Sequence, residues 1–134
     1  MASDRLRGDR SEKTVILDSS AVMMLFEFSI DLEDELTRLL GKFNIVVPSP
    51  IYEELSFLSE QGKGKKKLIA RPALEIIKKY EVVDVEGKGD DSVLNLAKKL
   101  NGIILTNDRE LRRRAKKLGL HNIYLRGKKT LEMD

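Results

Sequence analysis

Acidic residues stand at four separated points of this 134-residue chain, each at the end of a short apolar run or beside the start of a helical pattern. Two points carry one acid and two carry an adjacent pair. In chain order they are Asp18, Glu53 or Glu54, Asp90 or Asp91, and Asp108. Carboxylates that gather without a cation repel one another, and oxygen-only sites of this kind suit Mg²⁺ or Mn²⁺. Such a site supports metal-assisted phosphodiester hydrolysis.

The composition restricts how a metal could be held. The chain has no cysteine and a single histidine. Thiolate zinc sites and zinc sites built on several imidazoles are therefore excluded, and any metal must be bound by oxygen atoms.

Helix capping is the competing interpretation of Asp108. Asn107 followed three residues later by Glu110 has the form of a capping box, which satisfies unpaired backbone donors at a helix start. One short polar side chain per helix is enough for a cap, and serines are available for that purpose near other predicted helix starts. Capping therefore does not explain four acidic positions, and the rest of the chain must decide between the two interpretations.

Strand and helix patterns alternate along the chain. β-branched or apolar runs predict strands at 13–18, 43–47, 80–85, 103–106 and 122–126. Helical periodicity predicts helices within 19–28, 31–41, 48–58, 68–80, 90–102 and 108–119. Apolar strands that alternate with helices indicate a doubly wound α/β fold, a three-layer α/β/α sandwich with a central, mainly parallel five-stranded sheet. Ligands of such folds bind beyond the carboxyl ends of the strands, so we expect the four acidic positions to share one rim.

One domain accounts for the length. We expect a flexible N-terminal tail at 1–12, the domain at 13–129 and a C-terminal tail at 130–134. No apolar run approaches the roughly 20 residues that span a bilayer, and the first residues lack the apolar core of a signal peptide. These features predict a cytoplasmic protein with no membrane partner.

Positive charge is concentrated in one segment. Residues 109–129 contain nine lysines and arginines against one acid, whereas the formal net charge of the chain is only +3, so the remainder is net acidic. A basic surface attracts backbone phosphates without regard to sequence, although such a run can also be a solvated helix face. Together with the 63–67 lysine run, this segment supplies the candidate RNA contacts, which are Lys65, Lys66, Arg109, Arg112, Arg113 and Lys116.

The ordered motifs resemble those of one known family. "ILDSSAV", "VPSPIYEEL", "GDDSVLNLAKKL" and "ILTNDREL", followed by "IYLR", look like the PIN domain, the fold of many small metal-dependent ribonucleases. The resemblance covers residues 13–127 and is closer to archaeal single-domain members and ribosomal-RNA-processing endonucleases than to toxin ribonucleases. It implies an endoribonuclease that uses Mg²⁺ or Mn²⁺ and acts on RNA, in ribosomal RNA processing or as a toxin-type enzyme.

The resemblance also assigns roles to the first three acidic positions. Asp18 matches the family's first acid, a direct metal ligand. Glu54, which precedes a leucine, matches the second acid, with Glu53 as the near alternative. Asp91, which precedes a small residue, matches the third acid and metal ligand better than Asp90, which is then expected to be the helix N-cap.

The fourth motif places Asp108 at the family's last acid. By this resemblance Asp108 holds the metal or its water, and the capping role passes to Asn107. Thr106 and Asn107 occupy positions where the family often has hydroxyl or amide groups that orient ligands and water, and Ser19 is a further auxiliary residue beside the first acid. Catalysis is thus expected from Asp18, Glu54, Asp91 and Asp108.

A second function stays open at this point. A PIN-like chain could bind RNA without cutting it, as a scaffold in ribosome assembly. A homodimer and an antitoxin-like protein partner are also left open.

Overall fold

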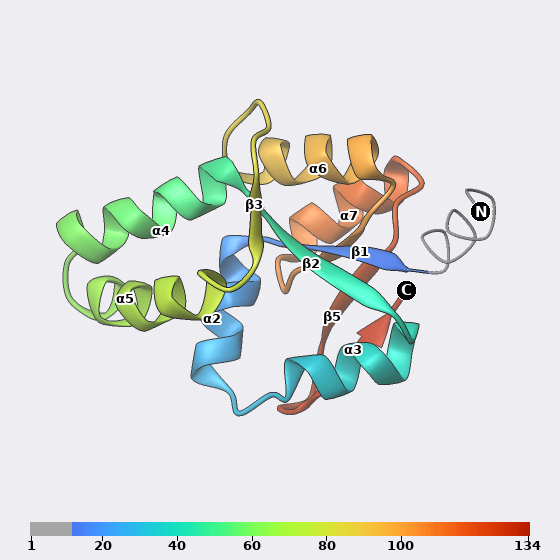
Figure 1. Ribbon diagram of the computed structural model, residues 1–134, viewed down its shortest axis with the longest axis horizontal. Helices are drawn as coiled ribbons and strands as arrows, with labels where there is room; N and C mark the ends of the chain where they lie inside the picture. Colours follow the sequence, from blue (N-terminus) through green and yellow to red (C-terminus); the bar gives the residue numbers. More distant parts are fainter. Residues whose placement is uncertain (1–11) are drawn as a thin grey trace, which may run out of the picture.

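A computed structural model describes residues 12–134 of the chain, in an alternating order of strands and helices (Figure 1). The strands are β1 (Lys13–Leu17), β2 (Phe43–Pro48), β3 (Glu81–Val83), β4 (Ile103–Leu105), β5 (Asn122–Arg126) and β6 (Thr130–Met133). The helices are α2 (Ser19–Glu27), α3 (Leu32–Leu40), α4 (Ser49–Gln61), α5 (Lys65–Ile77), α6 (Gly89–Leu100) and α7 (Arg109–Lys117).

The strands form one sheet in the order β3-β2-β1-β4-β5-β6. The first five strands are parallel to their neighbours, and β6 is antiparallel to β5. The predicted α/β class and mainly parallel sheet are confirmed, with six strands instead of five. The prediction of a C-terminal tail at 130–134 is wrong, because residues 130–133 form strand β6.

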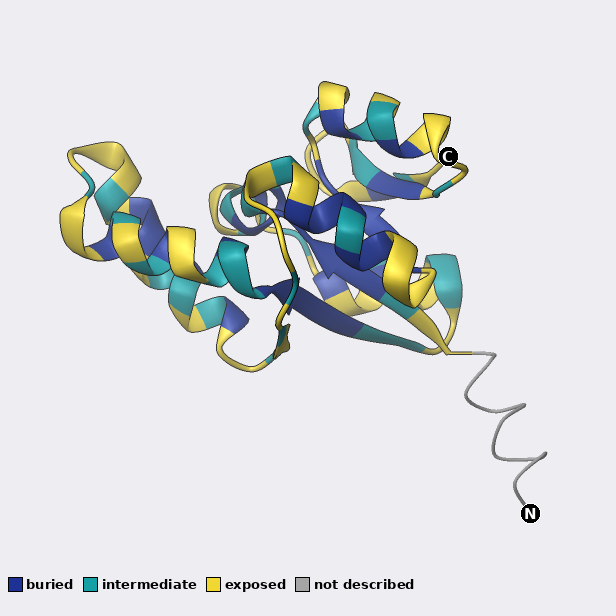
Figure 2. Ribbon diagram, turned by 90° about the horizontal axis from the view of Figure 1, so that it is seen from above, coloured by how far each residue is buried: buried dark blue, intermediate teal, exposed yellow. Residues whose placement is uncertain are grey.

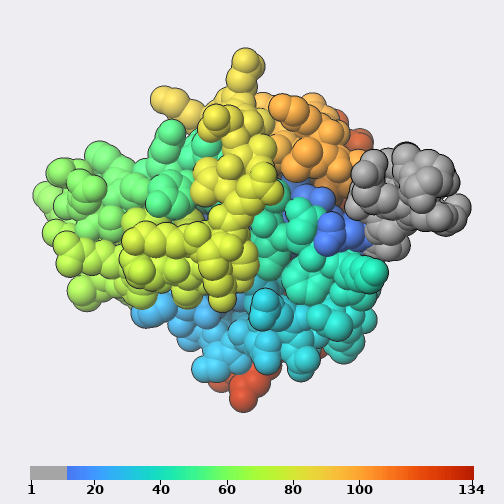
Figure 3. Space-filling model, in the orientation of Figure 1, coloured from blue at the N-terminus to red at the C-terminus, as the bar shows by residue number. Residues whose placement is uncertain are grey.

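Helices cover both faces of the sheet. After β1 the chain adds β2 and β3 on one side of it, and then returns to place β4 on the other side. The helices that connect β1 to β3 therefore cover one face of the sheet, and the helices that follow β3 cover the opposite face. Figure 1 shows α6 and α7 above the sheet and α2 and α3 below it. The α4 and α5 helices pack on each other as a hairpin that extends past one end of the sheet, and this hairpin forms the green lobe of Figure 3.

The central strands are buried because both faces are covered. Val15, Ile16 and Leu17 of β1 have no exposed surface, and Ile104 and Leu105 of β4 are equally buried. Figure 2 shows these strands as the buried centre of the molecule. Continuous apolar runs of this kind are what a parallel sheet between two helical layers requires.

Helix α3 holds β6 in place. The Glu35 carboxylate accepts a hydrogen bond of 2.8 Å from the Leu131 backbone N–H, and the Arg38 guanidinium donates one of 2.6 Å to the Leu131 carbonyl. Glu35 and Arg38 also pair with each other at 2.9 Å. Leu131 itself is fully buried, so this clamp joins the last strand to the core.

The predicted N-terminal tail lies outside the described residues except for Glu12. In the part of the chain that is described, no helix combines the length and the apolar character that crossing a membrane requires.

Candidate active site

Two neighbouring strands define the position of the site. Leu17 of β1 is paired with Leu105 of β4, and both strands end at the same edge. Helix α2 leaves β1 on one face, whereas α7 leaves β4 on the other, so the edge opens between them. Asp18 follows the first strand directly, and Thr106 follows the second.

Asp18 is buried at this edge and is held by several donors. Its carboxylate accepts hydrogen bonds from the Ala21 backbone N–H at 2.7 Å, from the Ser20 hydroxyl at 2.8 and 3.0 Å, and from the Thr106 hydroxyl. Burial raises the pKa of Asp18 to about 6, these hydrogen bonds oppose the shift, and the negative charge of Asp90 adds to it. The site therefore contains a carboxylate that costs free energy to ionise.

Ser20 connects the two strand ends and is absent from the predicted site. Its hydroxyl donates to Asp18, lies 3.1 Å from the Thr106 hydroxyl and accepts a hydrogen bond of 3.2 Å from the Asn107 backbone N–H. Ser19 was the predicted auxiliary residue, but Ser20 makes these contacts. The sequence signal is a hydroxyl residue two positions after an acid that ends a strand, where the first helical turn directs it back to that acid.

Asp108 caps helix α7. One of its oxygens accepts hydrogen bonds from the Glu110 backbone N–H at 2.8 Å and from the Leu111 backbone N–H at 3.2 Å. The prediction that Asn107 is the cap is wrong, because the Asn107 side chain accepts a hydrogen bond of 3.0 Å from the Leu125 backbone N–H. Capping and participation in the acidic site are compatible, since the charge of Asp108 also raises the pKa of Asp90.

The adjacent acids of helix α6 point to different surroundings. Burial, followed by the charge of Asp108, raises the pKa of half-buried Asp90, and Arg114 partly opposes this shift. Asp91 instead pairs with the Arg114 guanidinium at 2.7 Å. The prediction that Asp90 is the N-cap is wrong, because Lys88 occupies that position and the helix begins at Gly89.

Glu54 reaches the same group of charges from helix α4. Partial burial and then the charge of Asp90 raise the pKa of Glu54, and Lys66 opposes the shift. Glu53 and Glu54 together line a cavity of about 350 Å³ beside Lys88 and Gly89 at the start of α6. Glu54 thus interacts with the charge of Asp90 on the neighbouring helix α6.

Asp90 is the centre of the electrostatic group. The charge of Asp90 raises the pKa of Asp18 and of Glu54, and the charge of Asp108 raises the pKa of Asp90. Carboxylates and hydroxyls are the donors that Mg²⁺ and Mn²⁺ prefer, so the donor set fits such an ion. In residues 12–134, however, no three acidic or histidine side chains stand close enough together to hold one ion. A shared ion therefore requires side chains of this group to turn.

The predicted RNA contacts differ in their surroundings. Arg113 pairs with Glu110, and the Lys116 ammonium lies 4.0 Å from an Asp134 carboxylate oxygen. Arg112 is half-buried, with its guanidinium over the Tyr124 ring. The exposed members of the set also include Lys65, Lys66 and Arg109.

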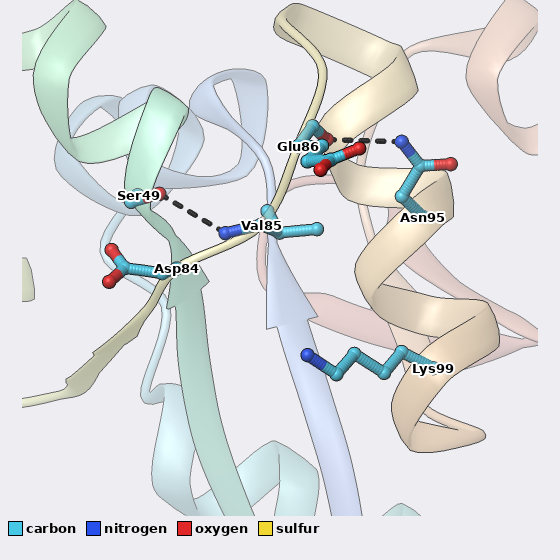
Figure 4. A pocket seen from close by; sticks show the side chains of 6 residues that line it. All are labelled: Ser49, Asp84, Val85, Glu86, Asn95 and Lys99. Carbon is cyan, nitrogen blue, oxygen red and sulfur yellow. Dashed lines mark hydrogen bonds between the residues drawn. The ribbon is translucent and has the colours of Figure 1, made fainter.

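A cavity of about 650 Å³ lies beside the loop that leads into α6 (Figure 4). The Val85 backbone N–H donates to the Ser49 hydroxyl at 3.3 Å, and the Asn95 side chain donates to the Glu86 carbonyl at 3.0 Å. Lys99 also borders this cavity. Neither Asp90 nor the three acids that interact with it lines the cavity. These hydrogen bonds fix the loop and so position the start of α6, where Asp90 lies.

The sequence of this chain matches that of a known protein family. The model of a family described as a PIN like domain matches residues 15–128. The chain belongs to the PIN-like domain family. The resemblance seen in the sequence motifs is thereby confirmed.

Two curated relatives match this PIN-like chain along nearly their whole length. Ribonuclease VapC9 of Archaeoglobus fulgidus is 33% identical over 134 residues, which cover 100% of this chain and 98% of that protein. Ribonuclease VapC4 of Methanocaldococcus jannaschii is 37% identical over 124 residues, covering 89% of this chain and 95% of that protein. The solved structure of the PIN domain endonuclease Utp24 has a TM-score of 0.74 to this chain at 23% identity, covers 90% of both chains, and shows the same fold.

Proposed function

We propose that this PIN-like protein is an endoribonuclease that depends on a divalent metal ion, Mg²⁺ or Mn²⁺. The observation that carries the proposal is that acids from separate elements meet at the carboxyl edge of the sheet. Asp18 and Asp108 follow the paired strands β1 and β4, and Glu54 lines a cavity at the start of α6, where Asp90 lies. The charge interactions of Asp90 with these three acids agree with this placement. Two relatives named as ribonucleases, at 33% and 37% identity, support RNA as the substrate.

We assign the ligand roles to Asp18, Asp90 and Asp108, with Glu54 at the rim of the site. This choice replaces Asp91, the ligand expected from the motif, because Asp91 pairs with Arg114. When bound, a divalent cation lowers the pKa of water and neutralises charge that develops on the phosphate. It would also remove the repulsion that adds to the effect of burial on the carboxylate pKa values.

Neighbouring groups of the protein hold the Asp18 and Asp108 carboxylates in fixed orientations. Ser20 and Thr106 fix the Asp18 carboxylate from both sides, so its position does not depend on a ligand. Asp108 is held by the first backbone N–H groups of α7. A phosphate at this edge would meet fixed carboxylates on the sheet side and the more exposed Glu54 on the hairpin side. In the hydrolysis, the water oxygen bonds to phosphorus and gives up a proton. The bond from phosphorus to the leaving ribose oxygen breaks, and that oxygen gains a proton.

A matched pair of variants tests the proposal. Asp90→Asn and Asp91→Asn make the same chemical change at adjacent positions of one helix. The substrate is an RNA pool that includes ribosomal RNA and other structured RNAs, incubated with manganese, magnesium or chelator. With either metal, we expect Asp90→Asn to abolish cleavage and Asp91→Asn to retain most of the wild-type cleavage. Mapping the cut RNA separates a ribosomal-processing role from a toxin-type role. Cleavage that continues in chelator, or that is unchanged by Asp90→Asn, contradicts the metal mechanism.

One observation favours a second function, an RNA-binding scaffold that does not cut. No three acids within residues 12–134 are arranged to hold an ion. A scaffold predicts RNA binding without cleavage under any metal condition, and no change in melting temperature on adding manganese. A rise in melting temperature with manganese that Asp90→Asn removes would exclude it.

A further inference from the structure

A stripe of basic side chains begins at the acidic site and follows one flank of helix α7. Arg109, Arg112 and Lys116 are three and four residues apart, so they lie along one side of the helix. Arg112 is one turn beyond the cap residue, and its backbone N–H donates to the Asp108 carbonyl at 3.0 Å. Leu111 and Ala115 face the core, whereas Arg109 and Lys116 are exposed and Arg112 between them is half-buried.

Arg112 is held by an aromatic ring. The centre of its guanidinium lies 4.1 Å from the centroid of the Tyr124 ring, and both side chains are half-buried. Its Nε is buried without a hydrogen-bond partner, and no acidic side chain within residues 12–134 forms an ion pair with it. A guanidinium fixed in this way keeps its full positive charge and its planar orientation.

The ring is also fixed relative to the site. Tyr124 lies on β5, and the backbone N–H of the next residue, Leu125, donates to the Asn107 side chain at 3.0 Å. Asn107 directly precedes Asp108. Arg112 and Tyr124 are thus joined to the Asp108 loop from two elements, one through the helix and one through the strand.

We propose that Arg112 and Tyr124 form a stacking subsite for the nucleobase beside the scissile phosphate, with Arg109 and Lys116 contacting the adjoining backbone. This subsite rests on the proposed ribonuclease function. A stacked arginine and tyrosine offer a base a flat, charged surface that accepts any base, because every base has a π-face. Only an unpaired base can reach such a surface, so the subsite selects single-stranded segments over duplexes.

Binding without metal tests the subsite independently of cleavage. Fluorescence anisotropy in chelator is measured with a short single-stranded RNA, the same RNA with abasic positions, and its duplex. We expect Tyr124→Leu to weaken binding of the intact single strand on the order of tenfold, and Tyr124→Phe to retain it, because phenylalanine keeps the ring. Arg112→Lys should also weaken it, since lysine keeps the charge but loses the plane. The abasic RNA should lose most of these differences.

A second cation–π pair provides the control. The Lys79 ammonium lies 5.4 Å from the centroid of the Tyr80 ring, just before β3 and therefore at the amino end of the sheet. Tyr80→Leu removes the same kind of ring far along the strands from the acids, and single-strand binding should not change.

Three outcomes would overturn the subsite, even if cleavage assays support the nuclease. These are unchanged binding by Tyr124→Leu, an equal loss by Tyr80→Leu, and an equal loss for intact and abasic RNA. Circular dichroism verifies that each variant is folded. If Tyr124→Leu does not fold, Arg112→Lys decides: loss of affinity for intact RNA alone supports the subsite, and unchanged affinity refutes it.

Discussion

Replacement of Asp18 by asparagine should make the metal-free protein more stable near neutral pH and less sensitive to pH. The Asp18 carboxyl has a pKa of about 6 in the folded chain, against 3.8 for an ordinary aspartate, chiefly because it is buried. Between these two values the folded protein keeps a proton that the unfolded chain has released. Stability from this group is therefore fully present below pH 3.8, falls as pH rises towards 6 and is constant above that value.

The size of the effect follows from the difference between the two pKa values. A separation of roughly 2 units corresponds to about 3 kcal/mol of unfolding free energy lost on ionisation. Asparagine is also a good N-cap, so Asp18→Asn should keep the cap of α2, where Asp18 accepts from the Ala21 backbone N–H. The unfolding free energy of Asp18→Asn minus that of the wild type should thus increase by about 3 kcal/mol as pH rises across this range.

Urea unfolding in chelator measures this difference from about pH 4 to about pH 8. Glu54 and Asp90 also have raised pKa values, but they occur in both proteins, so the comparison isolates Asp18 to first order. Curves for the two proteins that run parallel across this range would refute a buried, high-pKa Asp18. Manganese should stabilise the wild type and have little effect on the variant, which lacks a ligand charge.

Three other experiments test separate parts of the structure. Asp108→Ala should lower the unfolding free energy by about 1 kcal/mol in urea titrations whereas Asp108→Asn should not, because asparagine also caps helices; equal stability of the two would contradict the cap. Glu35→Ala should speed amide hydrogen exchange at Leu131, whose N–H bonds to Glu35, and an unchanged rate would show that the clamp contributes nothing. Arg109→Gln combined with Lys116→Gln should reduce the slope of the logarithm of the RNA-binding constant against the logarithm of salt concentration by about 1 to 2, as measured by anisotropy titrations at several salt concentrations. An unchanged slope would show that neither side chain contacts phosphate.

Much of the fold was predictable because its strands and helices have strong local patterns. The central strands β1, β2 and β4 are apolar runs whose burial on both faces leaves a clear trace in the sequence. β6 was missed because only one of its four residues is buried, so it leaves little apolar pattern in the sequence. Its Leu131 is held by Glu35 and Arg38, a contact that no local pattern indicates.

The places of the candidate site residues in the fold were predictable to within a residue or two. Asp18 and Asp108 follow strands, and strand ends fix where they lie. Asp90 and Asp91 are adjacent in a helix, where successive side chains point about 100° apart, so a shift of one residue in the helix start exchanges their roles. The start at Gly89 directs Asp90 towards the other acids and Asp91 towards Arg114.

The two outer strands of the sheet limit how copies of this protein could associate. β3 has three residues and β6 has four, so each edge presents few unpaired backbone groups. Long, flat edges recruit strands from other molecules and lead to aggregation, whereas short edges protect against it. β6 runs antiparallel to β5 and is hydrogen-bonded to Glu35 and Arg38 of α3. Replacement of β6 by a strand from another copy would break these hydrogen bonds to Leu131. We therefore expect contacts between copies to use helical surfaces, and the sheet to remain closed to strand exchange.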